Sequence, residues 1–330
     1  MDFSLVSDNL LSPPVLFFLV GIAARVLRSD LEIPAPIPTL FSLYLLWAIG
    51  YKGGVKLNEA GFDPTVIASL GSAVALSFLI PIVVGPVLSR RLSPADTCAL
   101  AAAFGSVSAV TFITSANFLE AQEIPYGGHM VAALALMEAP AVIVAVLLYR
   151  RKLARDRAVA AGGASRGDGV WPLFRESVLS GPVFLLLGSL LVGVLAGPRG
   201  YERLQPFTED VFYGMLVLFL LESGMTAAKK LGDLRQAGVF TVAMGIAIPV
   251  ANAAITLPIS AVLGLPRGDA FLLAILSASA SYIAVPAAMR LAVPEANPGV
   301  YLTIALGVTF PFNIALGIPL YLWAVGLVTG

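Results

Sequence analysis

Seven long stretches of this chain contain no charged residue, and this feature constrains its fold more than any other. A helix needs about 20 mostly apolar residues to cross the hydrocarbon core of a membrane. The composition agrees, with 58% hydrophobic and 12% charged residues over 330 positions. An ordinary soluble globule is therefore excluded, and an all-α membrane protein is expected. The charge-free stretches are Ile33–Tyr51, Pro64–Ser89, Thr97–Leu119, Ser177–Pro198, Gln236–Pro266, Ala270–Met289 and Ala296–Gly330.

The pattern predicts about ten transmembrane helices. The last charge-free run is long enough to hold a tilted helix or a re-entrant piece, so the count carries a margin of about one helix. The expected spans lie near residues 10–27, 33–50, 64–88, 95–118, 127–149, 177–197, 208–228, 238–263, 269–290 and 299–327.

Two runs of small and hydroxyl residues, Phe104–Ser115 and Ser277–Pro286, interrupt the apolar sequence. They lie 173 positions apart, counted from Ser108 to Ser281. Other segments recur at nearly the same offset, such as Trp47–Leu57 with Leu220–Leu231 and Met137–Tyr149 with Thr309–Tyr321. Paired polar breaks in a duplicated membrane chain indicate a secondary transporter, whose solute binds near the bilayer midplane where the breaks meet.

We therefore predict two halves, residues 1–149 and 177–330, each with five helices. An odd number of helices gives the halves opposite orientations, so they form two inverted five-helix repeats with broken helices at the midplane. Between them lies a cytoplasmic linker, residues 150–176, which is basic at first and then rich in glycine and alanine.

The distribution of basic residues predicts that both termini lie outside the cell. With the N-terminus outside, 15 of the 20 Lys and Arg residues fall in loops on the inner side and 5 on the outer side. An excess of positive charge marks the cytoplasmic side of membrane proteins.

The two breaks are the candidate binding site. Ser106 and Ser108, like Ser279 and Ser281, are spaced by two residues, which fits extended backbone better than one face of a helix. Pro286 is expected to end or kink the second broken helix. The start of a helix after a break offers free N–H groups and positive potential, which suit a small anion. The alternative is that small residues only allow close helix crossing. The predicted substrate-binding residues are Gly105, Ser106, Ser108, Thr111, Ser279, Ser281 and Tyr282.

Two acidic residues, Glu138 and Glu222, lie inside predicted spans, where a charge is costly and usually functional. Sodium prefers hard oxygen ligands, so we expect these carboxylates, with Thr309 and Asn313, to hold a coupling ion. A protonated structural carboxyl is the alternative reading. Cys98 and His129 are the single residues of their kinds. We expect no enzyme, no metal beyond sodium, no cofactor and no nucleic-acid partner.

The chain resembles the SbtA-type sodium-dependent bicarbonate transporter family over nearly its whole length. Several short motifs carry the resemblance together. They are IG-x-x-GG at Ile49–Gly54, FGSVS with Thr111 at Phe104–Thr111, Gly224-Met225 followed by Leu231–Arg235, Pro286 with Met289-Arg290, Ala296–Leu302, and Gly317–Leu320.

The resemblance implies sodium-coupled uptake of bicarbonate across the bacterial inner membrane. It also implies a homotrimer, a gate part that oligomerises, a core part that moves like an elevator, and a PII-like cytoplasmic regulator. The family's anion pocket maps onto Ser106, Ser108, Thr111, Ser279 and Ser281. This sequence departs from the family pattern at Tyr282, which replaces an aspartate, and at Glu138, which stands where the family has aspartate.

Sodium-coupled uptake of bicarbonate or a similar small anion is therefore the expected function. Two alternatives remain. The first is a proton-coupled carrier of another small solute, favoured by the lost aspartate and by the two intramembrane glutamates. The second is a membrane sensor that binds a solute without transporting it.

Overall fold

The structure is a computed structural model of the chain. It describes residues 3–34, 36–60, 63–161, 179, 181–231, 234–282 and 284–329, and these residues form helices and connections without a strand. Among them, six helical segments are long and apolar enough to cross a membrane, and Pro13–Val26 is a shorter apolar helix. The all-α membrane fold is thereby confirmed, whereas ten spans in two inverted repeats remain a prediction. The six segments are Pro64–Leu88, Pro94–Ala121, His129–Leu153, Phe184–Lys230, Gly238–Val262 and Pro298–Thr329.

Four helices form one group, which we call the panel: α2 (Pro13–Val26), α3 (Pro36–Ala60), α10 (Gly181–Gln205) and α11 (Val211–Leu231). Within the panel, α3 packs along α10 and α2 packs along α11. A short helix, α1 (Phe3–Leu10), precedes the panel and contacts α17, and a π-helical turn, η1 (Pro206–Asp210), joins α10 to α11.

Glycines bring the panel helices into backbone contact. A Cβ atom at Gly21 of α2 or at Gly224 of α11 would collide with a backbone carbonyl of the other helix. The same holds for Gly54 of α3 and Gly193 of α10. Gly197 instead has a φ of 58° and kinks α10, because few residues other than glycine adopt that conformation. The panel therefore consists of two tightly joined helix pairs.

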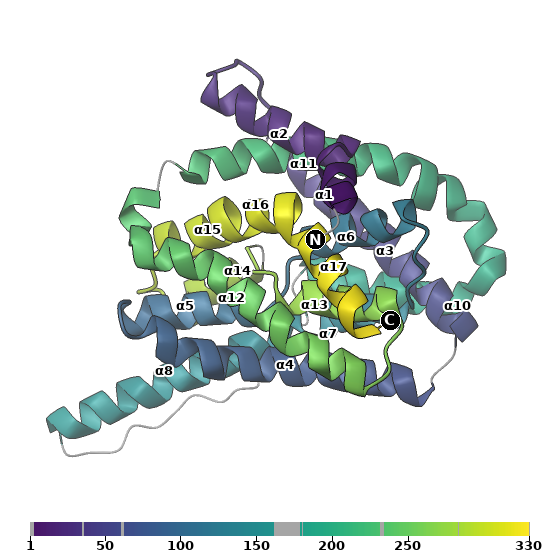
Figure 1. The fold of residues 1–330 in the computed structure, drawn as a ribbon. Coiled ribbons are helices and arrows are strands. Elements are labelled where there is room, and N and C mark those ends of the chain that lie inside the picture. Colours follow the sequence, from purple (N-terminus) through teal and green to yellow (C-terminus); the bar gives the residue numbers. More distant parts are fainter. Residues whose placement is uncertain are drawn as a thin grey trace.

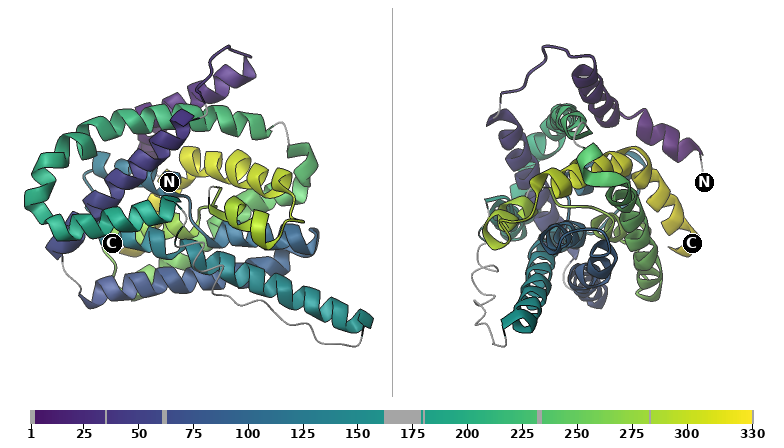
Figure 2. Two further views of the ribbon diagram at one scale, coloured as in Figure 1. Left: turned by 180° about the vertical axis from the view of Figure 1, so that it is seen from behind. Right: turned by 90° about the vertical axis from the view of Figure 1, so that its left-hand side faces the viewer.

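The remaining helices form the second group, which we call the bundle (Figures 1 and 2). Here α4 packs against α5 and α8, and α12 packs against α13 and α15. Two of its helices, α5 and α13, are almost fully buried. The bundle comprises α4 (Pro64–Leu88), α5 (Pro94–Gly105), α6 (Ala109–Ala121), α7 (His129–Leu136), α8 (Glu138–Ala161), α12 (Leu234–Val262), α13 (Arg267–Ser277), α14 (Ala284–Ala292), α15 (Pro298–Ile304), η2 (Ala305–Thr309), α16 (Phe310–Phe312), η3 (Asn313–Gly317) and α17 (Ile318–Thr329).

Local sequence signals account for the start of α4 and for the continuation of α8 beyond its predicted end. Asp63 caps α4, because its carboxylate accepts a hydrogen bond of 2.8 Å from the N–H of Val66. The predicted linker begins at residue 150, but α8 continues to Ala161. We attribute this to the Ala, Leu, Arg and Lys residues of that stretch, which are strong helix formers. The rest of the linker, residues 162–176, lies outside the described residues.

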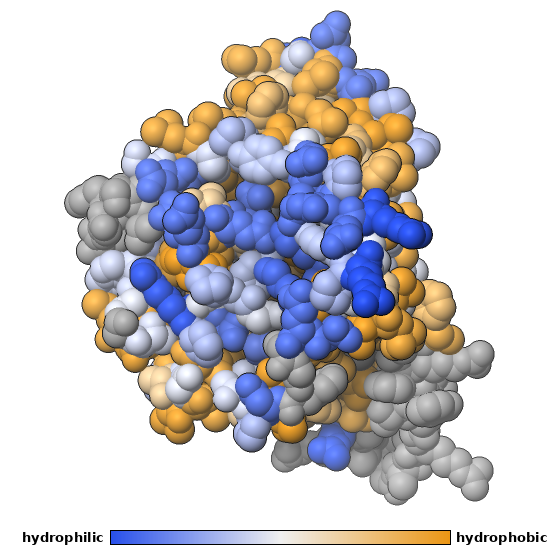
Figure 3. Space-filling view, turned by 90° about the vertical axis from the view of Figure 1, so that its right-hand side faces the viewer, coloured by the Kyte–Doolittle hydropathy of each residue, from blue (hydrophilic) through white to orange (hydrophobic). Residues whose placement is uncertain are grey.

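The surface has the polarity expected for a membrane protein. Figure 3 looks onto the end of the molecule opposite the projecting end of α8, where hydrophilic side chains gather at the centre and apolar ones at the rim. Large apolar side chains are exposed along α2, α4, α10 and α12, including Phe17, Ile82, Leu195 and Val262. Such extended exposed apolar surface indicates contact with lipid.

Candidate functional site

Both hydroxyl-rich runs break their helices. The first break separates α5 from α6, and its backbone is extended at Ser106 (φ −87°, ψ −170°) and Ser108 (φ −105°, ψ 107°). The second break follows Ser277, the last residue of α13, and ends where α14 begins at Ala284. The extended conformation predicted from the two-residue serine spacing is therefore confirmed in the first break.

The two breaks lie against each other and are joined by buried hydrogen bonds. The backbone N–H of Ser108 donates to the hydroxyl of Ser279 at 2.9 Å. In return, the N–H of Ser281 donates to the carbonyl of Ala103 at 2.9 Å. Each break thus satisfies a backbone donor of the other, which buried irregular backbone requires.

The hydrogen bonds determine which hydroxyl protons are free for a ligand. The Ser108 hydroxyl accepts from the N–H and from the hydroxyl of Thr111, at 3.2 and 3.0 Å. A serine oxygen has two lone pairs, so Ser108 can bind a further group only by donating its proton. Ser279 has no free proton, because it donates to the carbonyl of Leu276 at 3.0 Å. Ser281 accepts from the N–H of Val285 at 3.5 Å and keeps its proton.

Two side-chain amides bind backbone carbonyls at the second break. The Nδ2 atom of Asn252 donates to the carbonyl of Ser277 at 2.9 Å, and that of Asn313 donates to the carbonyl of Ala278 at 2.8 Å. These carbonyls are at the end of α13, where no helical partner remains for them. The two asparagines therefore cap the broken helix from α12 and η3.

A small cavity, which we call the central cavity, lies where the breaks meet the panel. Its volume is about 20 Å³, enough for about one water molecule. Its polar lining comes from Ser108, Ser281, Tyr282 and Glu138. The whole lining is Leu46, Val107, Ser108, Ala109, Leu134, Glu138, Leu186, Ser281 and Tyr282.

Three helices begin beside the central cavity. Ala109 is the first residue of α6, Ser281 and Tyr282 shortly precede α14, and Glu138 is the first residue of α8. The start of a helix carries a positive potential that stabilises an anion or a carboxylate. The cavity thus combines positive helix ends and donor hydroxyls with one carboxylate.

The start of α8 at Glu138 is a break that the sequence reading did not predict. Met137 is a turn residue between α7 and α8, and its carbonyl accepts a hydrogen bond of 2.6 Å from Ser77 of α4. Pro140 is the signal that could have identified this break, because proline favours the first turn of a helix. Pro286 is a related correction: it was expected to end or kink a helix, but it lies in the first turn of α14.

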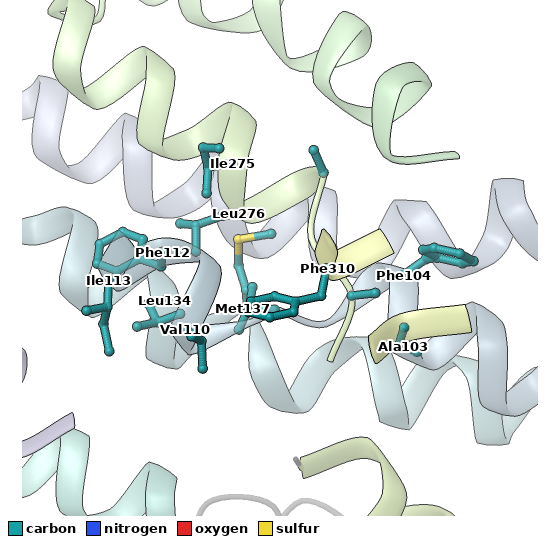
Figure 4. Close-up of a cluster of buried hydrophobic side chains, with 14 of the residues drawn as sticks. Ala103, Phe104, Val110, Phe112, Ile113, Leu134, Met137, Ile275, Leu276 and Phe310 are labelled. Carbon is teal, nitrogen blue, oxygen red and sulfur yellow. The ribbon is translucent and has the colours of Figure 1, made fainter. Parts of the chain in front are cut away.

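An apolar shell surrounds the crossing of the breaks (Figure 4). Phe104, Val110, Leu134, Met137 and Leu276 are all buried. Gly105 also belongs to this shell, because a Cβ atom there would collide with the ring of Pro81. A dry surrounding strengthens every electrostatic interaction inside the cavity.

Two further predicted residues have buried oxygens without a hydrogen-bond partner of acceptable geometry among the described residues. One is the hydroxyl of Ser106, which is fully buried. The other is the phenol of Tyr282, which lies beside Ser108 at the central cavity and packs edge-on against Phe310. A buried polar group without a partner is costly, so both are candidates for binding a ligand.

The predicted ion ligands are distributed over several places. Glu138 lies at the central cavity with the serines. Thr309 donates to the carbonyl of Gly245 at 2.7 Å, and Asn313 caps α13. Glu222 of α11 accepts a hydrogen bond of 2.6 Å from Thr226 and lines a different cavity.

Three cavities follow one another along α3. Pro38, Thr39, Ser42 and Leu43 line the Glu222 cavity, of about 330 Å³, together with Phe219, Glu222, Ser223, Thr226, Tyr282 and Leu306. Leu46 then lines the central cavity. Ala48, Ile49 and Lys52 line the third, the Lys52 cavity, of about 10 Å³, together with Ile113, Ala116, Asn117, Glu120, Tyr126, Thr208 and Phe212. Because Tyr282 lines both the central and the Glu222 cavities, its side chain lies between them.

Charged groups join panel and bundle at the Lys52 cavity. The Nζ atom of Lys52 lies 2.7 Å from Glu120 of α6 and 3.7 Å from Glu209 of η1. The phenol of Tyr126 donates to Glu120 at 3.1 Å, and the Lys56 ammonium lies 3.8 Å from the centre of the Tyr126 ring. Burial and the nearby Glu120 carboxylate raise the pKa of Tyr126 well above its usual value, so it stays a neutral donor.

Two broken helices that meet at a polar cavity, inside a helical membrane protein, are typical of secondary transporters. The family model of the Na+-dependent bicarbonate transporter superfamily matches residues 13–326. The chain belongs to this superfamily and is an integral membrane protein. No curated protein matches it at a significant level.

Proposed function

We propose that the protein imports bicarbonate or a similar small anion together with sodium, by alternating access. The observation that carries this proposal is the row of three cavities along α3, wide at the Glu222 end and nearly closed at the centre and at Lys52. A carrier needs a site that communicates with one side at a time. Superfamily membership supports the choice of anion and ion.

The free donors of the central cavity support an anion. Ser108 and Ser281 each retain a hydroxyl proton, and the start of α6 at Ala109 adds N–H groups and positive potential. We assign direct anion contact to these residues together with Tyr282. Ser106 does not line the cavity, and its buried hydroxyl without a partner among the described residues is a candidate for a further contact. Ser279 and Thr111, whose protons are already donated, position the breaks instead.

The carboxylate of Glu138 gives a physical reason why anion binding would be coupled to cation binding. Two negative charges about 4 Å apart repel by roughly 4 kcal/mol at an effective dielectric constant of 20. An anion can therefore share the cavity with an ionised Glu138 only if a cation neutralises the carboxylate. We infer that sodium does so, with oxygen ligands from Glu138 and neighbouring backbone. Thr309, Asn313 and Glu222 remain candidates for a second ion.

The arrangement of helices supports two inverted repeats, residues 1–149 and 177–330. In such repeats α2 corresponds to α10, and α3 corresponds to α11. The α2–α11 pair and the α10–α3 pair are then equivalent, and both are joined through glycines. We propose that the panel is the gate part, that it forms a homotrimer, and that the bundle moves against it like an elevator. The basic segment after residue 149 would bind the PII-like regulator.

The same geometry permits proton coupling, because protonation of Glu138 would also remove the repulsion. It also permits a sensor that binds the anion without moving it. We assign the protein no enzymatic reaction.

Uptake of labelled bicarbonate into proteoliposomes tests the proposal. We expect uptake that rises with an inward sodium gradient and persists without a pH gradient. Uptake that requires an inward proton gradient and ignores sodium would favour the proton-coupled alternative. Bicarbonate-dependent thermal stabilisation without any flux, in vesicles whose protein is folded, would favour the sensor.

A further inference from the structure

A fourth cavity shares no lining residue with the three along α3 and lies between α4, α5 and α8 of the bundle. We call it the α4–α8 groove, and its volume is about 400 Å³. Its lining is largely apolar and contains the two prolines within α4, Pro81 and Pro86. Besides these prolines, its lining includes Gly85, Ser89, Thr97, Ala145 and Lys152.

The groove has the length of one membrane leaflet. Pro81 at its deep end and Ser89 at its mouth are eight residues apart, which corresponds to about 12 Å along a helix. One leaflet of the hydrocarbon core is roughly 15 Å thick. Ile82 and Leu148, which also line the groove, are exposed, so it opens on the outside of the bundle rather than toward the panel.

The mouth of the groove is positively charged. Lys152 lines it, and Arg90 and Arg91 form the turn between Ser89 and Pro94, both of which also line it. Arg151 precedes Lys152 on α8. All four basic side chains are exposed, and none forms an ion pair with an acid among the described residues. These residues belong to the loops that the sequence assigns to the cytoplasmic side.

We propose that the α4–α8 groove binds an anionic phospholipid of the inner leaflet. One acyl chain would lie along Pro81, Gly85 and Ala145, and the phosphate would contact Lys152 and the turn of Arg90 and Arg91. The hydroxyl of Thr97, which has no partner among the described residues and lines the groove, is placed to meet the ester region. Basic pockets between transmembrane helices on the cytoplasmic side suit anionic head groups.

The test compares two purified, lipid-stripped variants with two matched controls. Gly85→Leu fills the groove, because a Cβ atom at Gly85 would meet nothing within 4 Å. Gly71→Leu is its control, since Gly71 lies on the same helix, also faces open space and is outside the groove. Lys152→Gln removes the charge at the mouth, and Arg25→Gln, on α2, controls for loss of a basic residue.

The readouts are lipid retention by native mass spectrometry and the shift in unfolding temperature. Phosphatidylglycerol should bind and stabilise the wild type more than phosphatidylcholine with the same chains. Gly85→Leu should lose both lipids, whereas Lys152→Gln should weaken only phosphatidylglycerol, roughly fivefold. Gly71→Leu and Arg25→Gln should behave like the wild type.

Equal retention of the two lipids by the wild type would overturn the proposal. So would equal stabilisation by inorganic phosphate, which would identify a phosphate site without a lipid. If Gly85→Leu does not fold, the Lys152→Gln variant still tests the proposal. A ratio of retained phosphatidylglycerol to phosphatidylcholine equal to that of the wild type would show that Lys152 does not bind the head group. None of these results depends on transport activity.

Discussion

Individual hydroxyl groups in the breaks have different hydrogen-bond partners although their sequence context is alike. Ser108 and Ser281 keep their protons for the central cavity, whereas Ser279 donates to Leu276 and receives the N–H of Ser108. The sequence predicts all three equally as ligands, because residue type and spacing do not show which neighbour, three or four residues away, each hydroxyl binds. The structure divides them into donors and positioning groups.

We therefore expect Ser108→Ala combined with Ser281→Ala to abolish anion uptake while the protein stays folded. Both substitutions remove donors that face the cavity, and donor bonds to a charged ligand are each worth about 1.5–3 kcal/mol. Radiolabelled bicarbonate uptake in proteoliposomes is the measurement, with thermal unfolding as the folding check.

Ser115→Ala is the matched control, because this buried serine on α6 donates to Thr111 of its own helix, at 2.7 Å, and does not line the central cavity. It should leave uptake unchanged. Normal uptake by the folded double variant would contradict the site assignment.

At the scale of elements, side chains from neighbouring helices hold the broken ends in place. Replacing Asn252 by alanine leaves the buried carbonyl of Ser277 without its amide donor. A buried unsatisfied group costs about 1–3 kcal/mol, so the unfolding temperature in detergent should fall clearly. Asn58→Ala should have little effect, because its bond to the carbonyl of Val194 is exposed and water can replace it. An Asn252→Ala protein as stable as the wild type would show that the cap contributes nothing.

The elements themselves could largely be predicted from the sequence. The predicted span 64–88 coincides with α4, because Asp63 and Pro64 give a strong start signal. The crossing of the two breaks also followed from their duplicated position. The break at Met137 was missed because it is one residue long and lies in an apolar run. The contributions of Leu46 and Leu186 to the cavity could not be predicted, since periodicity does not specify which helices pack together.

For the whole molecule, the ion pair of Lys52 with Glu120 joins panel and bundle at one end of the row of three cavities. Lys52→Gln should therefore expose the Lys52 cavity to the outer solution more often. The measurement is labelling of Ile113→Cys, in a Cys98→Ala background, by a membrane-impermeant thiol reagent on intact cells. Ile113 lines this cavity and is buried in the present structure.

We expect Lys52→Gln to increase the labelling rate several-fold. The exchanged pair Lys52→Glu with Glu120→Lys should return the rate toward that of the wild type, because it restores the attraction at 2.7 Å. The same slow labelling in all three proteins would show that these charges do not hold the end closed.

The hydrogen bonds from Ser108 to Ser279 and from Ser281 to Ala103 have a consequence for flux. Neither break can shift alone without losing buried bonds, so releasing a bound solute requires the displacement of a large part of the protein. Such collective motions take microseconds to milliseconds. When the displacement takes about a millisecond, one copy delivers on the order of a thousand solutes per second or fewer, far below the throughput of a pore. A cell that relies on this protein would adjust its supply through the number of copies in the membrane.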